Sequence, residues 1–488
     1  MSQPARTVTG PPSRPERTAV TTLNRLRSPL ALLDEPTDAP VLVDATAGRV
    51  WTQDELAEAV GHVAERLAAD MPALVFCLCG RTAASIVGYL GARRAGHAVA
   101  LLDADAPGEL IDSLIERYGP AFVIRPGARE RPEVRAHTEA RSPRVTDDLA
   151  VLLSTSGTTG SPKLVRLSDR NIAANASSIA QYLAIDGDER AIVSLPIHYS
   201  YGLSVLNSHL VAGASVILTD HSIMQPEFWE DCGRWGATSF AGVPYSYAIL
   251  ERTGLLRTSM PDTMRTLTQA GGRLAPESVI ELHELMSERD GRLWVMYGQT
   301  EATARISYVP PQALPDKAHT IGMPIPGGRL SVESDGELVT EADVEGELIY
   351  HGPNVMLGYA TQPDELAAPD MQRGELRTGD LGCVDADGFF RVTGRIKRIA
   401  KVFGMRQNLD EIEAAASAYG PVAATDGGEQ IVLWREAGAD LEPEDLRRAV
   451  ARQFGLNPRA FEVRDLDELP RTRSGKLAYE RLGEDHAR

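Results

Sequence analysis

The chain has 488 residues, of which 43% are hydrophobic and 24% charged, which is typical of a globular protein with more than one domain. Its formal net charge of −18 disfavours nucleic acid as a partner, because binding to a phosphate backbone requires a basic surface. A local cluster of positive charge would still be enough to bind a small anion.

No apolar run approaches the roughly 18 residues that a membrane-spanning helix needs. The chain begins with a Pro- and Arg-containing segment that lacks the apolar core of a secretion signal. Cys77 and Cys79 alternate along an apolar, strand-like run, which is not the spacing of a metal site. We therefore expect these two cysteines, like Cys232 and Cys383, to be buried and reduced in a cytoplasmic protein.

Residues 50–220 alternate between helix-like and strand-like segments. The first helix is expected over residues 52–70, with apolar residues at helical spacing and with Thr52 and Glu55 as a capping box. This alternation predicts parallel sheets covered by helices, arranged as two similar doubly wound α/β halves. The other expected strands are residues 73–80, 97–103, 190–196 and 215–220, and the other helices are residues 82–96, 171–183 and 202–213.

The pattern changes after about residue 325, where short alternating runs are separated by Gly and Asp. Residues 325–394 are therefore expected to form antiparallel β structure, as a small β-barrel. Residues 395–488 mix helix and strand patterns, with helices expected over residues 409–420 and 441–455. We predict a large domain of residues 1–394, followed by a small, mobile α+β domain of residues 395–488.

The stretch "STSGTTGSPK", Ser154–Lys163, follows an apolar, strand-like run and precedes a helix that starts near Ser168 or Asn171. Its glycines would let backbone N–H groups approach an anion, and its hydroxyls and Lys163 would add donors and charge. It lacks the Gly-Lys-Ser/Thr ending of the common phosphate loop. Taken alone, a Ser/Thr/Gly loop of this kind is more often a plain surface loop than a phosphate-binding one.

Four further motifs follow in order along the chain: "MYGQTEAT" (296–303), "LRTGDLG" (376–382), "VTGRIKRIAKVFGMRQNLDEIE" (392–413) and "LPRTRSGKLAYERL" (469–482). With the first stretch, in this order and at these separations, they resemble the adenylate-forming superfamily. That superfamily includes acyl-CoA synthetases, adenylation domains of peptide synthetases and luciferases. The resemblance runs from about residue 50 to residue 482 and is closest to stand-alone acyl-CoA or acyl-carrier-protein ligases.

The resemblance implies a residue set that binds ATP. The first stretch would close over the β and γ phosphates, and "AGGRL" (270–274) would flank the adenine. Asp380 would take both ribose hydroxyls, with Arg395 also at the ribose. Glu301 would bind Mg²⁺, which prefers carboxylate oxygens, together with Thr158. The implied ATP-binding residues are Thr155, Ser156, Gly157, Thr158, Thr159, Gly160, Lys163, Gly271, Gly272, Tyr297, Gly298, Thr300, Asp380 and Arg395.

The resemblance also implies a two-step reaction in which Lys476, with Thr158 and Glu301, is catalytic. In the first step a carboxylic acid attacks the α-phosphate of ATP, so that an acyl-AMP forms and pyrophosphate leaves. Mg²⁺ and Lys476 would offset the repulsion between the two anions. The small domain would then turn about Lys397, bringing Lys401 and Gly404 toward a thiol of coenzyme A or of carrier-protein phosphopantetheine. Because only a short tail follows Lys476, we expect that thiol to come from a separate molecule.

The segment "LPIHYSYGLS" corresponds to the acyl pocket of the superfamily. Tyr199 takes the usual position of a His and His198 stands one residue earlier, so either could face the substrate. Gly202, after Tyr201, replaces the Asp that amino-acid-activating relatives carry, which argues against an ordinary α-amino acid substrate. Tyr245, with Tyr247 nearby, either lines the pocket or is a half-buried aromatic with a satisfied hydroxyl.

Leu164 replaces the Gly that most relatives carry after the phosphate-loop lysine, so we expect a slightly less mobile loop. Two alternatives to the acid–thiol ligase remain. One keeps adenylation but transfers the acyl group to an amine, or activates an unusual oxyanion such as nitrite. The other is a non-catalytic nucleotide-binding scaffold.

Overall fold

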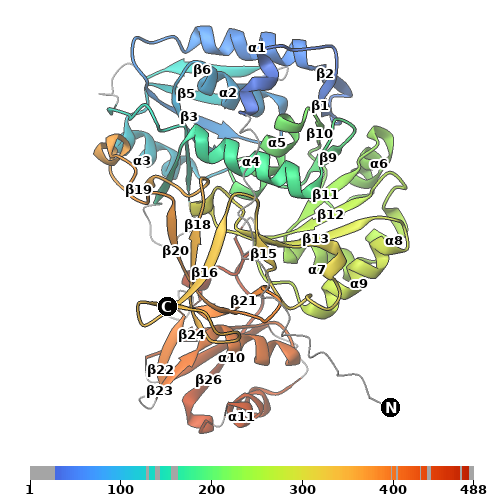
Figure 1. Ribbon diagram of the computed structural model, residues 1–488, viewed down its shortest axis with the longest axis vertical. Helices are drawn as coiled ribbons and strands as arrows, with labels where there is room; N and C mark the ends of the chain where they lie inside the picture. The colour runs from blue at the N-terminus through green and yellow to red at the C-terminus, as the bar shows by residue number, and fades with distance from the viewer. Residues whose placement is uncertain are drawn as a thin grey trace, which may run out of the picture.

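The computed structural model describes residues 28–127, 131–137, 143–154, 163–396, 398–402, 405–428, 430–436, 441–454, 456–472 and 475–482. In Figure 1, α/β layers occupy the upper part, strands β16, β18 and β20 lie below them, and the C-terminal helices α10 and α11 lie at the bottom. Among the described helices, none combines the length and apolar character that crossing a membrane requires.

A seven-stranded sheet holds the segment that ends at the predicted phosphate loop. Its strand order is β19-β8-β7-β4-β3-β5-β6, and its central strands β7, β4, β3 and β5 are parallel. The strands are β3 Leu74–Cys79, β4 Ala98–Asp103, β5 Phe122–Pro126, β6 Pro132–Ala136, β7 Val151–Ser154, β8 Leu164–Leu167 and β19 Gly358–Ala360. The helices between them are α1 Gln53–Arg66, α2 Ala83–Arg94 and α3 Gly108–Tyr118.

A nine-stranded sheet has the order β15-β14-β13-β12-β11-β9-β10-β1-β2, with parallel strands from β13 to β1. Its strands are β1 Pro40–Asp44, β2 Arg49–Thr52, β9 Arg190–Val193, β10 Ser215–Leu218, β11 Ser239–Gly242, β12 Thr266–Gln269, β13 Arg292–Tyr297, β14 Ser307–Val309 and β15 Met323–Pro324. The accompanying helices are α4 Asp169–Leu183, α5 Ser200–Ala212, α6 Pro226–Trp235, α7 Pro244–Thr253, α8 Leu255–Ser259 and α9 Pro276–Ser287.

One hydrophobic core joins the two large sheets. It contains Val151 of β7, Val216 of β10 and Leu206 of α5, together with residues of α1, α2 and α4. Because the sheets share this core, the carboxyl ends of their parallel strands are held in a fixed relation. Ligands of α/β proteins bind at such strand ends, and the predicted motifs follow β7, β12 and β13 directly.

The region after residue 325 forms a five-stranded antiparallel sheet in the order β17-β16-β18-β20-β21. Its strands are β16 Arg329–Ser334, β17 Glu337–Val339, β18 Gly346–His351, β20 Glu375–Val384 and β21 Phe390–Arg395. In this sheet Asp380 is directly opposite Arg395. The register of two neighbouring strands thus brings together two residues that lie 15 positions apart in the sequence.

The C-terminal elements have their own buried cluster, which includes Ile412, Leu433 and Val450. The strands are β22 Ile399–Val402, β23 Met405–Asn408, β24 Val422–Asp426, β25 Ile431–Glu436 and β26 Phe461–Leu466, and the helices are α10 Leu409–Ala416 and α11 Pro443–Gln453. The predicted boundary between residues 394 and 395 falls at the end of β21 and stays a prediction.

The predicted α/β fold class is confirmed, with antiparallel β structure after residue 325. The capping box at the start of α1 is present, since Thr52 accepts from the Glu55 N–H and Glu55 accepts from the Thr52 N–H. The four cysteines are buried free thiols, as predicted. Several predicted boundaries were wrong by two to four residues. Helix α1 ends at Arg66 rather than at 70, α5 begins at Ser200 rather than at 202, and β9 ends at Val193 rather than at 196.

Candidate active site

In the sequence, the predicted phosphate loop stands between β7, which ends at Ser154, and β8, which begins at Leu164. Its residues Thr155, Ser156, Gly157, Thr158, Thr159 and Gly160 lie outside the described residues. Lys163 is described and stands directly before β8, whose first residue, Leu164, is buried and pairs with Ala360 of β19. Pairing of β8 with β19 therefore places Lys163 beside the residues of β19.

Tyr359 of β19 connects Lys163 with the predicted magnesium ligand Glu301. The ammonium of Lys163 lies 5.4 Å from the centroid of the Tyr359 ring, and the Tyr359 hydroxyl donates a hydrogen bond of 2.8 Å to Glu301. Burial raises the pKa of Tyr359, and the charge of Glu301 raises it further. The hydroxyl therefore keeps its proton and holds one oxygen of the Glu301 carboxylate in place.

The turn that carries Glu301 is held rigidly. Glu301 lies in a 3-10 turn, Thr300–Ala302, and its carbonyl accepts from the Met356 N–H at 2.8 Å. Thr303 and Ala304 follow with φ angles of 55° and 105°, which a residue with a side chain adopts only at a cost. Gly298 must lack a side chain, because a Cβ there would lie 1.9 Å from the Ala304 carbonyl oxygen.

Buried Asn354, in the loop between β18 and β19, stabilises this strained turn. The side-chain amide of Asn354 donates to the Ala302 and Arg305 carbonyls at 2.8 and 2.9 Å. The backbone carbonyl of Asn354 accepts from the Thr303 hydroxyl at 2.6 Å. Only 1% of Asn354 is exposed. The network offsets the backbone strain and gives Glu301 a defined position.

Asp380 is the centre of a second network, although only 2% of it is exposed. Tyr297 donates to one carboxylate oxygen, Gln299 donates to the same oxygen at 2.9 Å, and the Arg395 Nε donates to the other at 2.9 Å. Burial and the Asp380 charge raise the pKa of Tyr297 well above its ordinary value, so its hydroxyl remains a donor.

Arg395 complements the charge of Asp380. Burial lowers the pKa of Arg395, but Asp380 and other negative neighbours outweigh that effect, and the net shift is upward. The guanidinium therefore stays charged beside the carboxylate. A carboxylate offers about four lone-pair sites, and three recorded donors leave acceptor capacity for hydroxyl groups of a ligand.

Lys476 reaches this site from the C-terminal segment. Its ammonium lies 5.6 Å from the centroid of the Tyr199 ring, while its backbone N–H donates to the Thr472 hydroxyl at 3.2 Å. The segment packs closely onto Tyr245, since a Cβ at Gly475 would lie 2.8 Å from the Tyr245 Cβ. Gly475 and Lys476 thus lie against Tyr245 of α7 and against Tyr199, directly before α5.

The charge of Lys476 responds to the other site residues. Although more than a third of the side chain remains in contact with solvent, the surrounding protein removes enough water from the ammonium to lower its pKa. The charge of Arg395 lowers this pKa further, while Glu301 and Asp380 act in the opposite direction. Residues from three distant segments therefore share one electrostatic environment.

Tyr199, Gly271 and Gly272 lie on adjoining sides of the site. Gly271 has a φ angle of 88°, and a Cβ there would lie 2.6 Å from the Tyr199 hydroxyl oxygen. A Cβ at Gly272 would lie 3.2 Å from Pro244. The missing side chains therefore let the backbone after β12 approach Tyr199 and α7 closely, as the predicted adenine-flanking turn requires.

The remaining predicted pocket residues differ in their surroundings. Tyr201 is buried and its hydroxyl bonds to Thr268 at 2.9 Å, and Tyr247 is buried with its hydroxyl on the Thr268 carbonyl. His198 is partly exposed. A Cβ at Gly202 would lie 2.2 Å from the Pro196 carbonyl oxygen, so close packing alone already requires glycine there.

The residues predicted to act at the hinge lie largely outside the described part of the chain. Lys397 and Gly404 are outside the described residues, and only the backbone of Lys401, within β22, is described. The structure therefore brings together Glu301, Asp380, Arg395 and Lys476 but does not address the predicted hinge.

The arrangement fits Mg²⁺ and ATP. Mg²⁺ usually binds one or two carboxylates together with substrate phosphates, and Glu301 supplies one carboxylate oriented by Tyr359. Within the described ranges, no group of three or more His, Cys, Asp or Glu side chains could hold a metal ion on its own. Mg²⁺ that is bound by Glu301 and by phosphate oxygens of ATP matches this arrangement.

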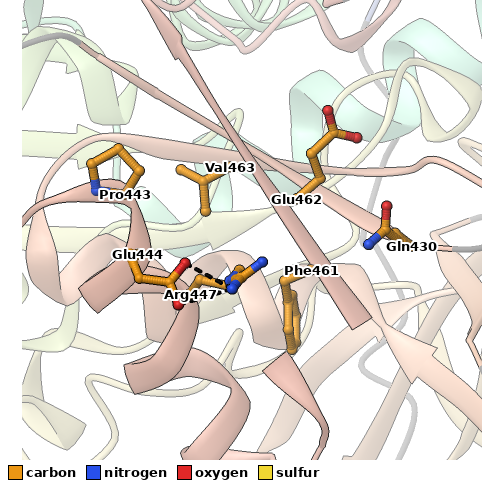
Figure 2. Close-up of a pocket in the computed structure, with 7 residues that line it drawn as sticks. All are labelled: Gln430, Pro443, Glu444, Arg447, Phe461, Glu462 and Val463. Carbon is orange, nitrogen blue, oxygen red and sulfur yellow. Dashed lines mark hydrogen bonds and ion pairs between the residues drawn. The ribbon is translucent and has the colours of Figure 1, made fainter. Parts of the chain in front are cut away.

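A separate hollow of about 230 Å³ lies on the C-terminal elements, between α11 and β26 (Figure 2). Its charged lining residues are paired, because Arg447 and Glu444 form an ion pair of 2.7 Å and Glu462 pairs with Arg464 at 2.7 Å. None of the predicted ATP-binding residues lines it. The seven lining residues are Gln430, Pro443, Glu444, Arg447, Phe461, Glu462 and Val463.

Comparison with known proteins identifies the family. The model of the AMP-binding enzyme family matches residues 32–360. Sulfoacetate–CoA ligase of Cupriavidus necator is 32% identical over 376 residues, which cover 73% of this chain and 72% of the relative. L-proline–[L-prolyl-carrier protein] ligase of Pseudomonas fluorescens is 30% identical over 68% of this chain and 67% of the relative.

Solved structures agree with the sequence comparisons. ATP-bound MatB from Rhodopseudomonas palustris aligns with a TM-score of 0.77 and 25% identity, covering 94% of this chain and 98% of that structure. The fold and the site define an adenylate-forming enzyme. The chain belongs to the AMP-binding enzyme family.

Family membership confirms the predicted enzyme class. The protein is an ATP-dependent, AMP-forming ligase that activates a carboxylic acid as an acyl-AMP and transfers the acyl group to a thiol. The predicted use of ATP is likewise confirmed.

Three residues of the site escaped sequence analysis: Tyr359, Gln299 and Asn354. Tyr359 lies 58 positions from its partner Glu301, and Gln299 lies 81 positions from Asp380. No local pattern marks such pairs, because folding alone brings them together. Only the position of Gln299 inside the motif "MYGQTEAT" could have drawn attention to it.

Tyr359→Phe tests the support of Glu301. Loss of the hydroxyl removes a hydrogen bond to a charged group, so we expect about tenfold lower apparent affinity for Mg²⁺ in pyrophosphate release, corresponding to about 1.4 kcal/mol. Tyr118→Phe is the matched control, because the Tyr118 hydroxyl bonds to Ala360 of the same strand at 3.2 Å and does not contact Glu301. Equal Mg²⁺ dependence of the two variants would contradict the role of Tyr359.

Proposed function

We propose that the cluster of Lys476, Glu301, Asp380 and Arg395 is the adenylation site. The observation that carries this proposal is the position of Lys476, which a C-terminal loop brings to the carboxyl ends of the large sheets. We place the α-phosphate and the attacking carboxylate between the Asp380 network and the Glu301 network, beside the charge of Lys476. Thr158, from the phosphate loop, completes the proposed catalytic set and the magnesium ligands.

Electrostatics gives Lys476 its role in the first step. Two anions must approach each other, and a positive charge in a partly desolvated site stabilises the transition state more strongly than it would in water. Mg²⁺, held at Glu301 and Thr158, would neutralise charge on the phosphates as pyrophosphate leaves. Lys163 and the loop residues 155–160 would bind the β and γ phosphates.

The nucleoside would lie between the turn after β12 and the Asp380 network. Gly271 and Gly272 lie closely against Tyr199 and Pro244, and we propose that the base binds along the backbone of this turn. Asp380 retains acceptor capacity for ribose hydroxyls, and Arg395 lies on its outer oxygen. Tyr297, Gly298 and Thr300 form the wall between the ribose and Glu301.

Tyr199, rather than His198, would face the acid. The Tyr199 ring lies beside the Lys476 ammonium, and its hydroxyl lies against Gly271. Tyr201 would form the next part of the acyl pocket, and Gly202 would allow α5 to pack against Pro196. Tyr245 would support the loop of Lys476, since Arg471 lies over its ring at 5.2 Å.

In the second step, residues 395–488 would turn about Lys397 and withdraw Lys476 from the site. Lys401 and Gly404 would then approach the entering thiol. We propose coenzyme A as the acceptor, because the relatives include coenzyme A ligases. A separate acyl carrier protein is the alternative, since one relative acts on a carrier protein. A cytoplasmic location is part of the same proposal.

Lys476→Ala separates the two steps. We expect adenylation, measured as pyrophosphate release, to fall by about 10²–10³-fold, because the variant loses a charge that acts on the transition state. Transfer of the acyl group from supplied acyl-AMP to coenzyme A should change by less than about threefold, since Lys476 has left the site in that step. Equal loss of both half-reactions would contradict the two-orientation mechanism.

The pH dependence of adenylation gives an independent test of Lys476. Because burial and Arg395 lower its pKa, activity should fall with rising pH at values below about 10.4, the pKa of an ordinary lysine. In Lys476→Arg the charge persists to higher pH, so the remaining adenylation activity should lose this alkaline decline. An identical decline in both proteins would show that another group titrates.

Product analysis distinguishes the proposed acceptor from its rivals. With acid, ATP and Mg²⁺ present, coenzyme A, carrier protein, amines and nitrite would each be supplied, and the products identified by mass spectrometry. Formation of an acyl-coenzyme A supports the proposal, whereas an amide or a nitrite-derived product contradicts it. Folded protein that releases no pyrophosphate with any acid or with nitrite would support the scaffold alternative.

A further inference from the structure

A cavity of about 30 Å³ lies between helices α4 and α5 and the face of the nine-stranded sheet. This volume accommodates about two water molecules, since one needs about 10–15 Å³. Ala241 and Thr268 of the sheet, Ser204 of α5, and Met296 and Arg305 are among the residues that line it. We call this space the acyl cavity.

Two neighbouring aromatic rings relate Lys476 to Arg305, which lines the acyl cavity. The Tyr199 ring lies 5.6 Å from the Lys476 ammonium, and its centroid lies 6.4 Å from that of Tyr201. The guanidinium of Arg305 lies 4.1 Å from the Tyr201 ring centroid. An acid placed along these rings would have the reacting carboxylate at Lys476 and its other end at Arg305.

Arg305 is a buried cation without an acidic partner among the described residues. Only 2% of it is exposed, and its hydrogen bonds are to the Met296 sulfur at 3.4 Å, to the Ala304 carbonyl at 3.3 Å and to the Tyr182 hydroxyl. A guanidinium has five N–H donors, and buried charges in proteins are usually paired. The Met296 sulfur, the Ala304 carbonyl and the Tyr182 hydroxyl are three neutral acceptors, so they neither neutralise the charge of Arg305 nor use all five of its donors.

The charge of Arg305 faces the aromatic rings. Burial raises the pKa of Tyr201 to about 12, and the positive charge of Arg305 opposes that rise. Burial likewise raises the pKa of Tyr199, with Arg305 again acting in the opposite direction. Both hydroxyls thus stay protonated, and neither supplies the negative charge that Arg305 lacks.

The position of Arg305 is fixed by the strained turn that also follows Glu301. Thr303 and Ala304 have positive φ angles, and Asn354 donates to the Arg305 carbonyl at 2.9 Å. Asn175 of α4 donates to the same carbonyl at 3.3 Å. A guanidinium held in this way is preorganised for a ligand, which reduces the entropic cost of binding.

Two other residues that line the acyl cavity, His209 and Glu189, present hydrogen-bond acceptors, in contrast to the donors of Arg305. The His209 Nδ1 lies 2.8 Å from the Val205 carbonyl, which can only accept, so Nδ1 carries the proton and Nε2 is an acceptor. That buried Nε2 has no hydrogen-bond partner in the described structure. Glu189, which also lines the cavity, bonds to Arg265 at 3.1 Å. An anion would therefore bind at Arg305 and not deeper.

We propose that Arg305 selects short carboxylic acids that carry a second anionic group, a carboxylate or a sulfonate, which its guanidinium binds. This inference rests on the proposed adenylation site and names its substrate class. The small volume of the acyl cavity excludes long alkyl chains, and the acceptor atoms of His209 and Glu189 disfavour a negative group beyond Arg305.

The test compares acids of equal size. Malonate and succinate would be assayed against 3-methylbutanoate and 4-methylpentanoate, in which an isopropyl group replaces the second carboxylate. We expect kcat/KM for pyrophosphate release to favour each diacid by at least about tenfold. Arg305→Met should lower kcat/KM for the diacids by about 100-fold and that for the monoacids by less than about threefold.

Two further variants act as controls. Arg166→Met removes another buried arginine, which bonds to the Ala368 and Leu357 carbonyls at 2.6 and 3.1 Å, and should leave the ratio of diacid to monoacid unchanged. Arg305→Lys keeps the charge but loses the forked donors, so it should lower the ratio by about tenfold. Thermal stabilisation by ATP would show that each variant is folded.

The following outcomes would overturn the inference. The wild-type enzyme could prefer the monoacids, or Arg305→Met and Arg305→Lys could leave the ratio unchanged while still binding ATP. Pyrophosphate release with monoacids alone would overturn this inference and leave the proposed adenylation site intact. Absence of pyrophosphate release with every acid, from wild-type protein that binds ATP, would contradict the proposed function, and this inference would fall with it.

Discussion

A buried carboxylate must be paired, and the pairing of Asp380 organises this structure. Its partners Tyr297 and Gln299 belong to the end of β13 in the nine-stranded sheet, whereas Asp380 and Arg395 belong to the five-stranded sheet. Removing one partner of such a buried network typically costs about 3–5 kcal/mol. The network therefore fixes the two sheets relative to each other at the point where the nucleotide would bind.

The contact between the nine-stranded and five-stranded sheets at Asp380 also affects the charges of the site. Arg395 lies at the end of β21, directly before the segment that leads into the C-terminal elements, and its charge reaches Lys476. Lys163, Glu301 and Tyr359 form a second group on the side of the phosphate loop. Positive charge thus comes from three separate parts of an otherwise acidic chain, so the site attracts a polyanion despite a net charge of −18.

Residues inside local motifs could be predicted from the sequence, whereas residues defined by long-range pairing could not. Glu301, Asp380, Arg395 and Lys476 each lie in a recognisable stretch, and the structure brings them together. Tyr359 and Arg305 lie outside any recognisable motif, because the role of each depends on a partner on another element: Glu301 for Tyr359 and Tyr201 for Arg305. Arg305 stands only four positions after Glu301, but its burial beside Tyr201 depends on the strained turn between them.

The errors in element boundaries have local causes. Helix α5 begins at Ser200 after Tyr199, whose side chain makes no capping hydrogen bond, so the sequence shows no start signal. Strand β9 was predicted to reach Pro196 because apolar residues continue, but its pairing ends at Val193, as proline cannot donate to a ladder. Fold class survives such errors, because it depends on the alternation of elements and not on their exact ends.

The most direct test of this account is nucleotide binding by Asp380→Asn. The amide keeps the shape of the carboxylate but removes its charge, and its NH₂ group would face donors of Tyr297, Gln299 or Arg395. AMP affinity, measured by calorimetry, should therefore fall at least about tenfold. Asp385→Asn is the matched control, since Asp385 follows the same strand and pairs with Lys317 at 2.8 Å, outside the site. Unchanged AMP affinity in folded Asp380→Asn would contradict the central role of this carboxylate.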